Sequence, residues 1–148
     1  MNANATVSEI LDAKGRQTWS ISPSHTVLEA IQMMAEKNVG ALLVLEGGKL
    51  VGIISERDYT RKVILRGKAS KDTAVKEILS DTVIHVKPTD SVEECMRLMT
   101  SHRVRHLPVL EGDKVTGVVS IGDLVNWIIS AQTSTIHQLQ TYISGYPG

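Results

Sequence analysis

Aromatic residues, proline and cysteine are all scarce in this chain of 148 residues. Phenylalanine is absent, the aromatic share is 3%, and there are four prolines and one cysteine. We therefore expect a core of aliphatic side chains. The single cysteine, Cys95, excludes an intramolecular disulfide, a Cys-rich zinc site and a CxxC redox motif. Its apolar helical position predicts a small buried hydrophobe rather than a nucleophile.

Net charge and long apolar runs are also lacking. Sixteen Lys and Arg residues balance 16 Asp and Glu residues, so a polyanion-binding surface is not favoured. The apolar runs, such as residues 41–45, are far shorter than the roughly 20 residues that span a bilayer. The first six residues show neither a basic nor an apolar signal region, so no signal peptide is expected. These features predict a soluble cytoplasmic protein.

An internal repeat organises the chain. A shift of 65 residues places Pro23 on Pro88 and continues without a gap until Asp58 meets Asp123. Fourteen of these 36 positions are identical, which establishes the repeat. Because units of this size rarely sustain a core alone, we expect the two copies to pack on each other about a pseudo-twofold axis.

Each copy predicts the element order β-α-β-β-α. In the first copy, an extended piece at residues 19–22 precedes a T-x-x-E capping box at residues 26–29, which opens a helix. Apolar runs at residues 41–45 and 50–54 flank a Gly-rich turn and predict a hairpin, and a second helix follows at residues 55–65. The second copy has corresponding elements at residues 83–86, 91–94, 107–110, 115–119 and 120–130.

These elements predict an α/β (α+β) fold with short flanking segments. A helix from Thr6 to Ala13 is expected near the start, with Thr6 and Glu9 forming its cap. The predicted organisation is an N-terminal segment (1–16), repeat 1 (17–66), a polar connector (67–82), repeat 2 (83–130) and a C-terminal helix and tail (131–148).

A Gly-x-x-Ser-x-x-Asp motif ends each hairpin, at residues 52–58 and 117–123. Ser and Asp at this spacing cap a helix, which is a sufficient structural reason for the pair. Glycine inside a strand indicates that some group approaches the backbone closely. A helix start beside such a gap presents N–H groups to an anion, so a ligand site is the other interpretation.

These paired motifs resemble the tandem CBS-domain (cystathionine-β-synthase domain) family, also called the Bateman module. Residues 102–109 are similar to the family's middle strand, and the resemblance covers residues 17–130. It implies a stand-alone bacterial CBS pair with two intertwined repeats, which binds an adenosine nucleotide in the cleft between them and regulates a partner without catalysis. In the family, the aspartates hold the ribose hydroxyls and the serines face a phosphate.

The resemblance implies a set of site residues and a ligand class. AMP or NAD is favoured, ADP, ATP and S-adenosylmethionine are possible, and no metal is expected. Arg57, Arg105 and His106 are candidates for phosphate contacts, whereas Arg61 and Lys62 are interpreted as surface charges. The candidate nucleotide-binding residues are Ser22, Val39, Gly40, Ala41, Ser55, Arg57, Asp58, Val86, Val104, Arg105, His106, Ser120 and Asp123.

Partners and rival functions follow from the remaining features. Leu124, Trp127 and Ile128 suggest a homodimer face, although they also suit an intramolecular core. The regulated protein is not identifiable from the sequence. A ligand-free protein-interaction module, in which the Ser–Asp pairs are only caps, is one alternative, and a nucleic-acid-binding CBS protein is another. Five scattered histidines and the lack of a nucleophile elbow or phosphate loop predict that the protein is not an enzyme.

Overall fold

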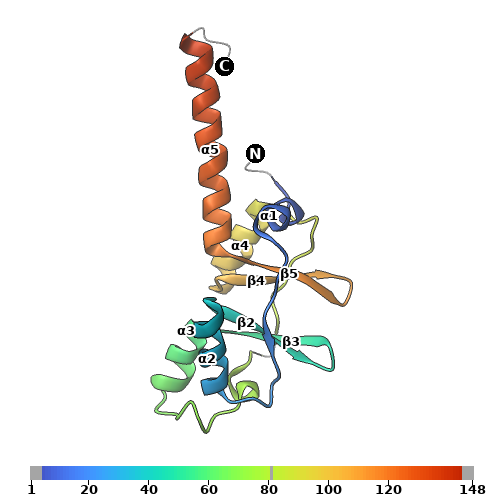
Figure 1. The fold of residues 1–148 in the computed structure, drawn as a ribbon, viewed down its shortest axis with the longest axis vertical. Helices are drawn as coiled ribbons and strands as arrows, with labels where there is room; N and C mark the ends of the chain where they lie inside the picture. The colour runs from blue at the N-terminus through green and yellow to red at the C-terminus, as the bar shows by residue number, and fades with distance from the viewer. Residues whose placement is uncertain (1–4, 81, 145–148) are drawn as a thin grey trace. The chain divides into compact units, whose positions relative to one another are not determined.

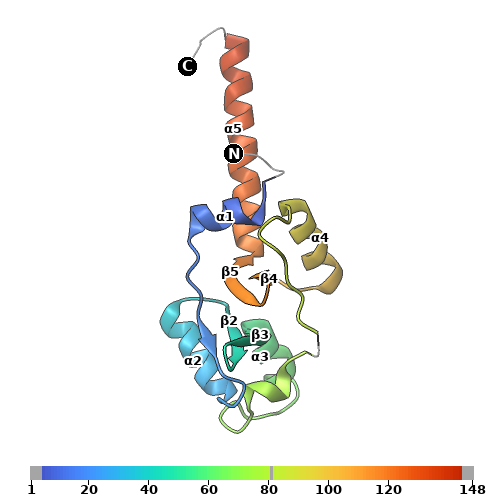
Figure 2. The ribbon, with the colours of Figure 1, turned by 90° about the vertical axis from the view of Figure 1, so that its right-hand side faces the viewer.

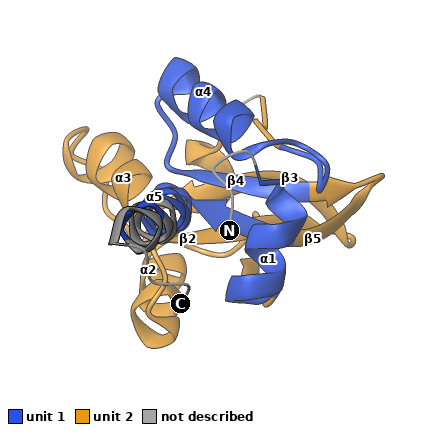
Figure 3. Ribbon diagram, turned by 90° about the horizontal axis from the view of Figure 1, so that it is seen from above, with its two compact units in different colours: residues 1–16, 86–109, 117–148 blue, residues 17–85, 110–116 orange. Residues whose placement is uncertain are grey.

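The computed structural model describes residues 5–80 and 82–144, which fall into two compact units of mixed α/β structure. Unit 1 comprises residues 1–16, 86–109 and 117–148, and unit 2 comprises residues 17–85 and 110–116 (Figure 3). Each unit therefore combines parts of the chain that are far apart in the sequence. The α/β fold class is confirmed, and the predicted tail at residues 145–148 lies outside the described residues.

The sheet of unit 2 contains the predicted hairpin. Strands β1 (Ser20–Ile21), β2 (Ala41–Glu46) and β3 (Lys49–Ser55) form a three-stranded sheet in that order, with β1 parallel and β3 antiparallel to β2. Gly47 and Gly48 join β2 to β3 with φ angles of 59° and 80°. A two-residue turn with positive φ at both positions matches the twist of a hairpin, which explains the paired glycines.

Helix α2 (Val27–Lys37) begins at the capping box that the sequence predicts. The Thr26 hydroxyl accepts a hydrogen bond from the Glu29 N–H at 3.1 Å, and the Glu29 carboxylate accepts one from the Thr26 N–H at 3.0 Å. The helix ends at Asn38, which adopts the left-handed conformation with φ 55°. The cap hydrogen bonds lower the pKa of Glu29 below its ordinary value.

Two short helical segments complete unit 2. Helix α3 (Glu56–Tyr59) runs directly into a π-helical turn, η1 (Thr60–Ile64), and the 3₁₀ turn η2 (Val75–Ile78) follows later in the chain. Helices α2 and α3 lie beside strands β2 and β3 (Figure 1). The core is aliphatic, as predicted, and consists of Ile21, Val27, Ala30, Met34, Leu42, Val44, Ile54, Val63, Val75 and Ile78.

Unit 1 holds the elements of the second copy, apart from residues 110–116 at the β4–β5 turn, together with the N-terminal helix. These elements are α1 (Val7–Lys14), α4 (Val92–His102), β4 (His106–Glu111), β5 (Lys114–Ser120) and α5 (Ile121–Ser144). Helices α1 and α4 both contact α5 (Figure 2). The extended piece predicted at residues 83–86 is reduced to one parallel bridge, in which the Val86 N–H donates to the Pro108 carbonyl at 3.0 Å.

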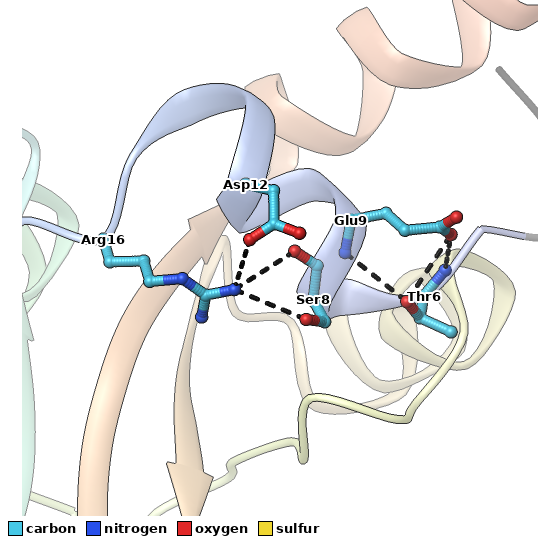
Figure 4. Close-up of polar contacts among 5 residues, drawn as sticks. All are labelled: Thr6, Ser8, Glu9, Asp12 and Arg16. Atoms are coloured by element: carbon cyan, nitrogen blue, oxygen red, sulfur yellow. Dashed lines mark hydrogen bonds and ion pairs between the residues drawn. The ribbon is translucent and has the colours of Figure 1, made fainter.

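Helix α1 is held at both ends by its own side chains (Figure 4). Thr6 and Glu9 form the predicted capping box, with the Thr6 N–H donating to the Glu9 carboxylate at 2.8 Å. Beyond the other end, the Arg16 guanidinium pairs with Asp12 at 2.6 Å and approaches the carbonyl and hydroxyl of Ser8 at 3.4 Å. These contacts fix a segment that the sequence identifies only as a short helix.

The start of each repeat packs in the unit of the other repeat. Residues 6–11 (TVSEIL) and 74–79 (AVKEIL) are similar but lie 68 positions apart, so the gap-free shift of 65 does not reveal them. The N-terminal segment pairs with the start of α4 through a bridge between Thr6 and Ser91. The connector pairs with the start of α2 through a bridge between Thr26 and Ala74. The segment predicted to be a polar connector therefore contributes to the core of unit 2.

Among the residues that the structure describes, no helix combines the length and apolar character needed to cross a bilayer.

Candidate functional site

The Ser55–Asp58 motif of unit 2 forms a capping box at the junction of β3 and α3. The Asp58 N–H donates to the Ser55 hydroxyl at 3.3 Å. In return, one carboxylate oxygen of Asp58 accepts from the Ser55 N–H at 2.9 Å and from its hydroxyl at 3.0 Å. The structural interpretation of the motif as a helix cap is thus confirmed. The side chain of Asp58 stays 26% exposed, so its carboxylate is reachable from solvent.

A lysine meets the second carboxylate oxygen of Asp58. The Lys62 ammonium lies 3.4 Å from Asp58 Oδ1 and donates to the Ile78 carbonyl at 2.9 Å. It also approaches the Ser80 hydroxyl at 3.4 Å. Lys62 was predicted to be a surface charge; its side chain is 29% exposed, and its ammonium also connects the motif to the η2 segment. Lys62 lies in the π-helical turn that follows α3, a feature found frequently at functional sites.

The Ser120–Asp123 motif of unit 1 repeats the cap at the junction of β5 and α5. The Asp123 N–H donates to the Ser120 hydroxyl at 3.1 Å, and the Asp123 carboxylate accepts from the Ser120 N–H at 2.8 Å. Lys14, at the end of α1, donates to the same carboxylate at 2.6 Å and to the Val118 carbonyl at 2.8 Å. This aspartate is therefore also paired with an ammonium group.

Leucine side chains, rather than an open gap, lie against the two motif glycines. A Cβ atom built on Gly52 lies 2.9 Å from a methyl carbon of Leu79, and one built on Gly117 lies 2.8 Å from a methyl carbon of Leu11. The close approach predicted at both glycines is confirmed. The approaching group is a side chain of the protein, so these glycines give no independent support for a ligand.

The strand entries predicted to face a purine lie next to the caps. The Gly40 carbonyl accepts from the Glu56 N–H at 3.1 Å, and Ala41 is the strand partner of Ser55. In unit 1, the Arg105 carbonyl accepts from the Ile121 N–H at 2.8 Å. Each unit thus brings residues before the hairpin to the start of its Ser–Asp helix. Arg105 is exposed, and neighbouring His106 is partly buried.

The other predicted residues have mainly local structural contacts. Val39 and Val104 follow residues in the left-handed conformation, and their N–H groups donate to helix carbonyls at 3.0 and 3.1 Å. Ser22 contacts the hydroxyl of Ser24 and the ring of His25. Val86 is buried with 1% exposure, and Arg57 is a partly buried residue of α3.

The remaining chemistry-bearing groups do not assemble a second site. Cys95 is buried in α4, and desolvation raises the pKa of its thiol to about 12, which confirms the predicted buried hydrophobe. Within residues 5–80 and 82–144, no three His, Cys, Asp or Glu side chains gather as metal ligands.

A cavity of about 430 Å³ occurs within unit 2, away from the Ser–Asp motifs. None of the predicted nucleotide-binding residues lines it, so the candidate site is defined by the motifs. The lining residues are Thr18, Leu43, Leu45, Gly48, Lys49, Glu111, Asp113, Lys114 and Val115.

The sequence analysis missed Lys14 and interpreted Lys62 as surface. Lys62 carried a detectable signal, because it stands four residues after Asp58 and so on the same helical face. Lys14 carried none, since 109 residues separate it from Asp123 and only the packing of α1 brings the two together.

Comparisons with known proteins agree with the repeat and the fold. The CBS-domain model matches residues 7–64 and 75–130, and the chain belongs to the CBS-domain family. Each match begins at one of the two similar segments described above. CBS-domain pairs are regulatory modules and are typically not catalysts.

Three related proteins illustrate the similarity. The mitochondrial CBS domain-containing protein CBSX3 of Arabidopsis thaliana is 38% identical over 96% of this chain and 73% of its own. A CBS-domain protein structure from Burkholderia ambifaria is 50% identical with a TM-score of 0.83, covering 86% of this chain and 96% of that one. The CBS pair of protein MJ0100, in complex with 5′-methylthioadenosine and S-adenosyl-L-methionine, shares the fold with a TM-score of 0.76 at 22% identity, covering 86% and 98%.

Proposed function

We propose that this protein is a non-catalytic regulatory module that binds adenosine nucleotides through its Ser–Asp motifs, with AMP or NAD as the favoured ligand. The observation that supports this function best is the same arrangement in both units. An aspartate carboxylate, 26% or 22% exposed, lies at a helix start and pairs with an ammonium, and the serine hydroxyl accepts from the N–H of that aspartate at 3.3 or 3.1 Å. Adenosine is the moiety that the ligands of MJ0100 share, and that protein has the same fold.

The roles of the residues follow from their hydrogen-bonding capacity. An ionised carboxylate accepts about four hydrogen bonds, so Asp58 or Asp123 retains acceptor sites for two ribose hydroxyls besides its cap contacts. The hydroxyl of Ser55 or Ser120 donates to a phosphate oxygen. The purine lies against the strand entries, at Gly40 and Ala41 in one unit and at Arg105 and His106 in the other.

Isothermal titration of nucleotide-stripped protein with AMP, NAD, ATP and S-adenosylmethionine tests this function. Selective binding that is lost in Asp58→Ala/Asp123→Ala supports it. The matched control is Glu29→Ala, which removes a capping box of the same geometry from α2. That control keeps its ligand if the motifs bind it. Absence of binding by folded wild-type protein contradicts the proposal.

A ligand-free interaction module is the second candidate function. Its specific support is that both Ser–Asp pairs already make complete helix caps. In that case, Asp58→Asn and Asp123→Asn alter stability, while no adenosine compound gives heat. A metal site receives no support from the described residues, and nucleic-acid binding receives none from the balanced charge. The cytoplasmic location stays part of the proposal and rests on the single buried cysteine.

We further propose a homodimer, with a face on α5 that differs from the predicted one. Leu124 is fully buried and belongs to the core of unit 1, whereas Val125, Ile129 and Leu139 are 39%, 54% and 56% exposed. The positions 125, 129, 132, 136, 139 and 143 (V, I, Q, I, L, I) alternate spacings of four and three residues. In this heptad pattern, Ile occupies the a positions 129, 136 and 143, and Val, Gln and Leu occupy the d positions 125, 132 and 139. A β-branched residue at a favours a parallel two-stranded coiled coil.

The second copy of the chain is the partner that fits this seam. Between Ile121 and Ser144, Asp123 is the sole Asp, Glu, Lys or Arg, so two parallel copies place no like charges along the seam. The helix continues beyond α1 and α4 (Figure 1). Sedimentation of wild type, Ile129→Glu and the off-seam control Ser130→Glu tests the dimer. Only Ile129→Glu should become monomeric, and a monomeric wild type contradicts the proposal.

A further inference from the structure

Each candidate ribose carboxylate is paired with one lysine that is itself fixed in place. Lys14 lies 2.6 Å from Asp123, and Lys62 lies 3.4 Å from Asp58. Their side chains are 36% and 29% exposed, so neither lysine is a fully solvated surface side chain. Backbone carbonyls hold both, with Val118 accepting from Lys14 at 2.8 Å and Ile78 accepting from Lys62 at 2.9 Å.

The two lysines come from positions that do not correspond between the repeats. The shift of 65 that aligns Asp58 with Asp123 aligns Lys62 with Trp127. The shift of 68 that aligns the segments at 6–11 and 74–79 aligns Lys14 with Thr82. The two ion pairs therefore arise from unrelated positions of the chain. A helix cap does not need such a lysine, because the α2 cap at Thr26 and Glu29 is complete without one.

Ion pairs at this exposure contribute little to stability, so stability is a weak reason for having two of them. Their position has a direct consequence for binding. At Asp58, the cap and Lys62 already use three of about four acceptor sites, so a ribose that donates two hydroxyls competes with the ammonium. At Asp123, Lys14 and the Ser120 N–H share Oδ2, so a ribose hydroxyl that donates to this oxygen competes with Lys14. A displaced ammonium needs a new acceptor, because a partly desolvated charge without a partner is costly. A phosphate on the ligand supplies that acceptor, whereas an uncharged or cationic ligand does not.

We propose that Lys14 and Lys62 select ligands, each exchanging its aspartate for the phosphate of an adenosine ligand. The sites therefore prefer adenosine phosphates, including dinucleotides, to uncharged adenosine and to thioether or sulfonium compounds such as 5′-methylthioadenosine and S-adenosylmethionine. This inference rests on the proposed nucleotide-binding function. It narrows the ligand class and assigns the choice to two residues outside the Ser–Asp motifs.

Calorimetric titration with AMP and with adenosine tests the selection. We expect wild type to bind AMP at least about tenfold more tightly than adenosine, the ratio that one charge-assisted contact at a partly exposed site gives. In Lys14→Met/Lys62→Met, which keeps the aliphatic stems, AMP binding weakens about tenfold while adenosine binding is unchanged or stronger. Lys14→Arg/Lys62→Arg retains the preference. Lys71→Met, at an exposed lysine of the connector, is the matched control and behaves as wild type.

The outcomes separate this inference from the function on which it rests. If wild type binds adenosine or 5′-methylthioadenosine as tightly as AMP, the selection is overturned while nucleoside binding stands. The same conclusion follows if the methionine variant, folded by circular dichroism, keeps the wild-type ratio. If no adenosine compound binds to wild type, the proposed function itself fails. If the methionine variant does not fold, the comparison of AMP with adenosine and 5′-methylthioadenosine in wild type still decides the question, because it requires no variant.

Discussion

Replacing Gly117 with alanine tests whether this glycine is required by the packing of Leu11. The added Cβ atom lies 2.8 and 2.9 Å from two methyl carbons of Leu11, a fully buried side chain. Leu11 must then shift or leave its preferred rotamer, and overpacking of this kind costs about 1–3 kcal/mol. Alanine regains about 0.5–1 kcal/mol over glycine in a strand. We therefore expect Gly117→Ala to lower the free energy of unfolding by about 1–2 kcal/mol.

Gly52→Ala is the matched comparison in the other repeat. Its Cβ atom lies 2.9 and 3.2 Å from two methyl carbons of Leu79. Leu79 is only partly buried, so it moves aside more easily than Leu11. The expected cost is below about 1 kcal/mol. Urea unfolding followed by circular dichroism measures the free energy of unfolding of both variants. The two values can be compared if the slope of this free energy against urea concentration is the same as in wild type.

The sign of the effect should reverse when Leu11 is truncated. Leu11→Ala alone should cost about 2–5 kcal/mol, because it leaves a cavity. Adding Gly117→Ala in that background places a methyl group into the cavity and should raise the stability. The double-mutant cycle therefore shows a coupling between the two positions in contact. If Gly117→Ala has the same effect in both backgrounds, contact with Leu11 is not the reason for the glycine.

Three further results are expected. Burial raises the pKa of Cys95 to about 12, so the stability linked to this thiol is complete below its ordinary pKa of 9.0 and declines as the pH rises above that value. Labelling of Cys95 by a thiol reagent at pH 8 should therefore follow global unfolding, and fast labelling of the native protein contradicts the burial. Because the pKa of Glu29 is lowered in the folded state, its contribution to the cap is present above the ordinary pKa of 4.5 and is lost as the pH falls through the folded pKa. Glu29→Gln should therefore be less stable than wild type at pH 7 and equally stable near pH 2. A difference in stability that does not change with pH refutes the cap. Deleting residues 1–14 removes Val7, Ile10 and Leu11 from the core of unit 1, so stability should fall by more than about 4 kcal/mol, and a deletion as stable as wild type in urea refutes the packing.

The local elements of the fold were predictable because local chemistry determines them. Capping boxes at residues 6–9 and 26–29, and the two-glycine turn at residues 47–48, each specify an element boundary within a few residues. The second extended piece was not predicted correctly, since a single bridge at Val86 replaces it. A strand depends on its partner, and the alternation of apolar residues does not show how far the pairing extends.

The periodicity of apolar residues did not predict which segments of the chain make up each unit. The segment at residues 67–82 was predicted to be a polar connector because glycine and polar residues cluster at residues 67–72, although Val75 and Ile78 further along it are buried. The similarity of residues 74–79 to residues 6–11 was concealed by the three-residue difference between the shifts of 65 and 68. Short apolar pairs of this kind become core residues only through tertiary contacts, which no local pattern shows.

The candidate site divides along the same line. The Ser–Asp pairs were found because serine and aspartate three residues apart make a motif, and both form the caps that this spacing predicts. Lys14 was not found, because its contact with Asp123 spans 109 residues. Leu11 and Leu79 were missed for the same reason, so the glycines beside them were interpreted as room for a ligand.

The contacts of Asp123 connect ligand binding to the fold. Its carboxylate accepts from the Ser120 N–H, which caps α5, and from Lys14, which attaches the end of α1. A ligand that takes the lysine's place at this carboxylate therefore removes one attachment of α1 and leaves the cap. Because a ligand shifts a conformational equilibrium only by its differential affinity for the two states, the strength of the Lys14 contact limits how much binding alters α1. Under the proposed function, α1 in unit 1 and the η2 segment in unit 2 are the elements that respond when a ligand occupies the Ser–Asp sites. Hydrogen exchange at residues 7–14 and 75–80 should therefore change on addition of AMP to wild type, and should not change in Lys14→Met/Lys62→Met.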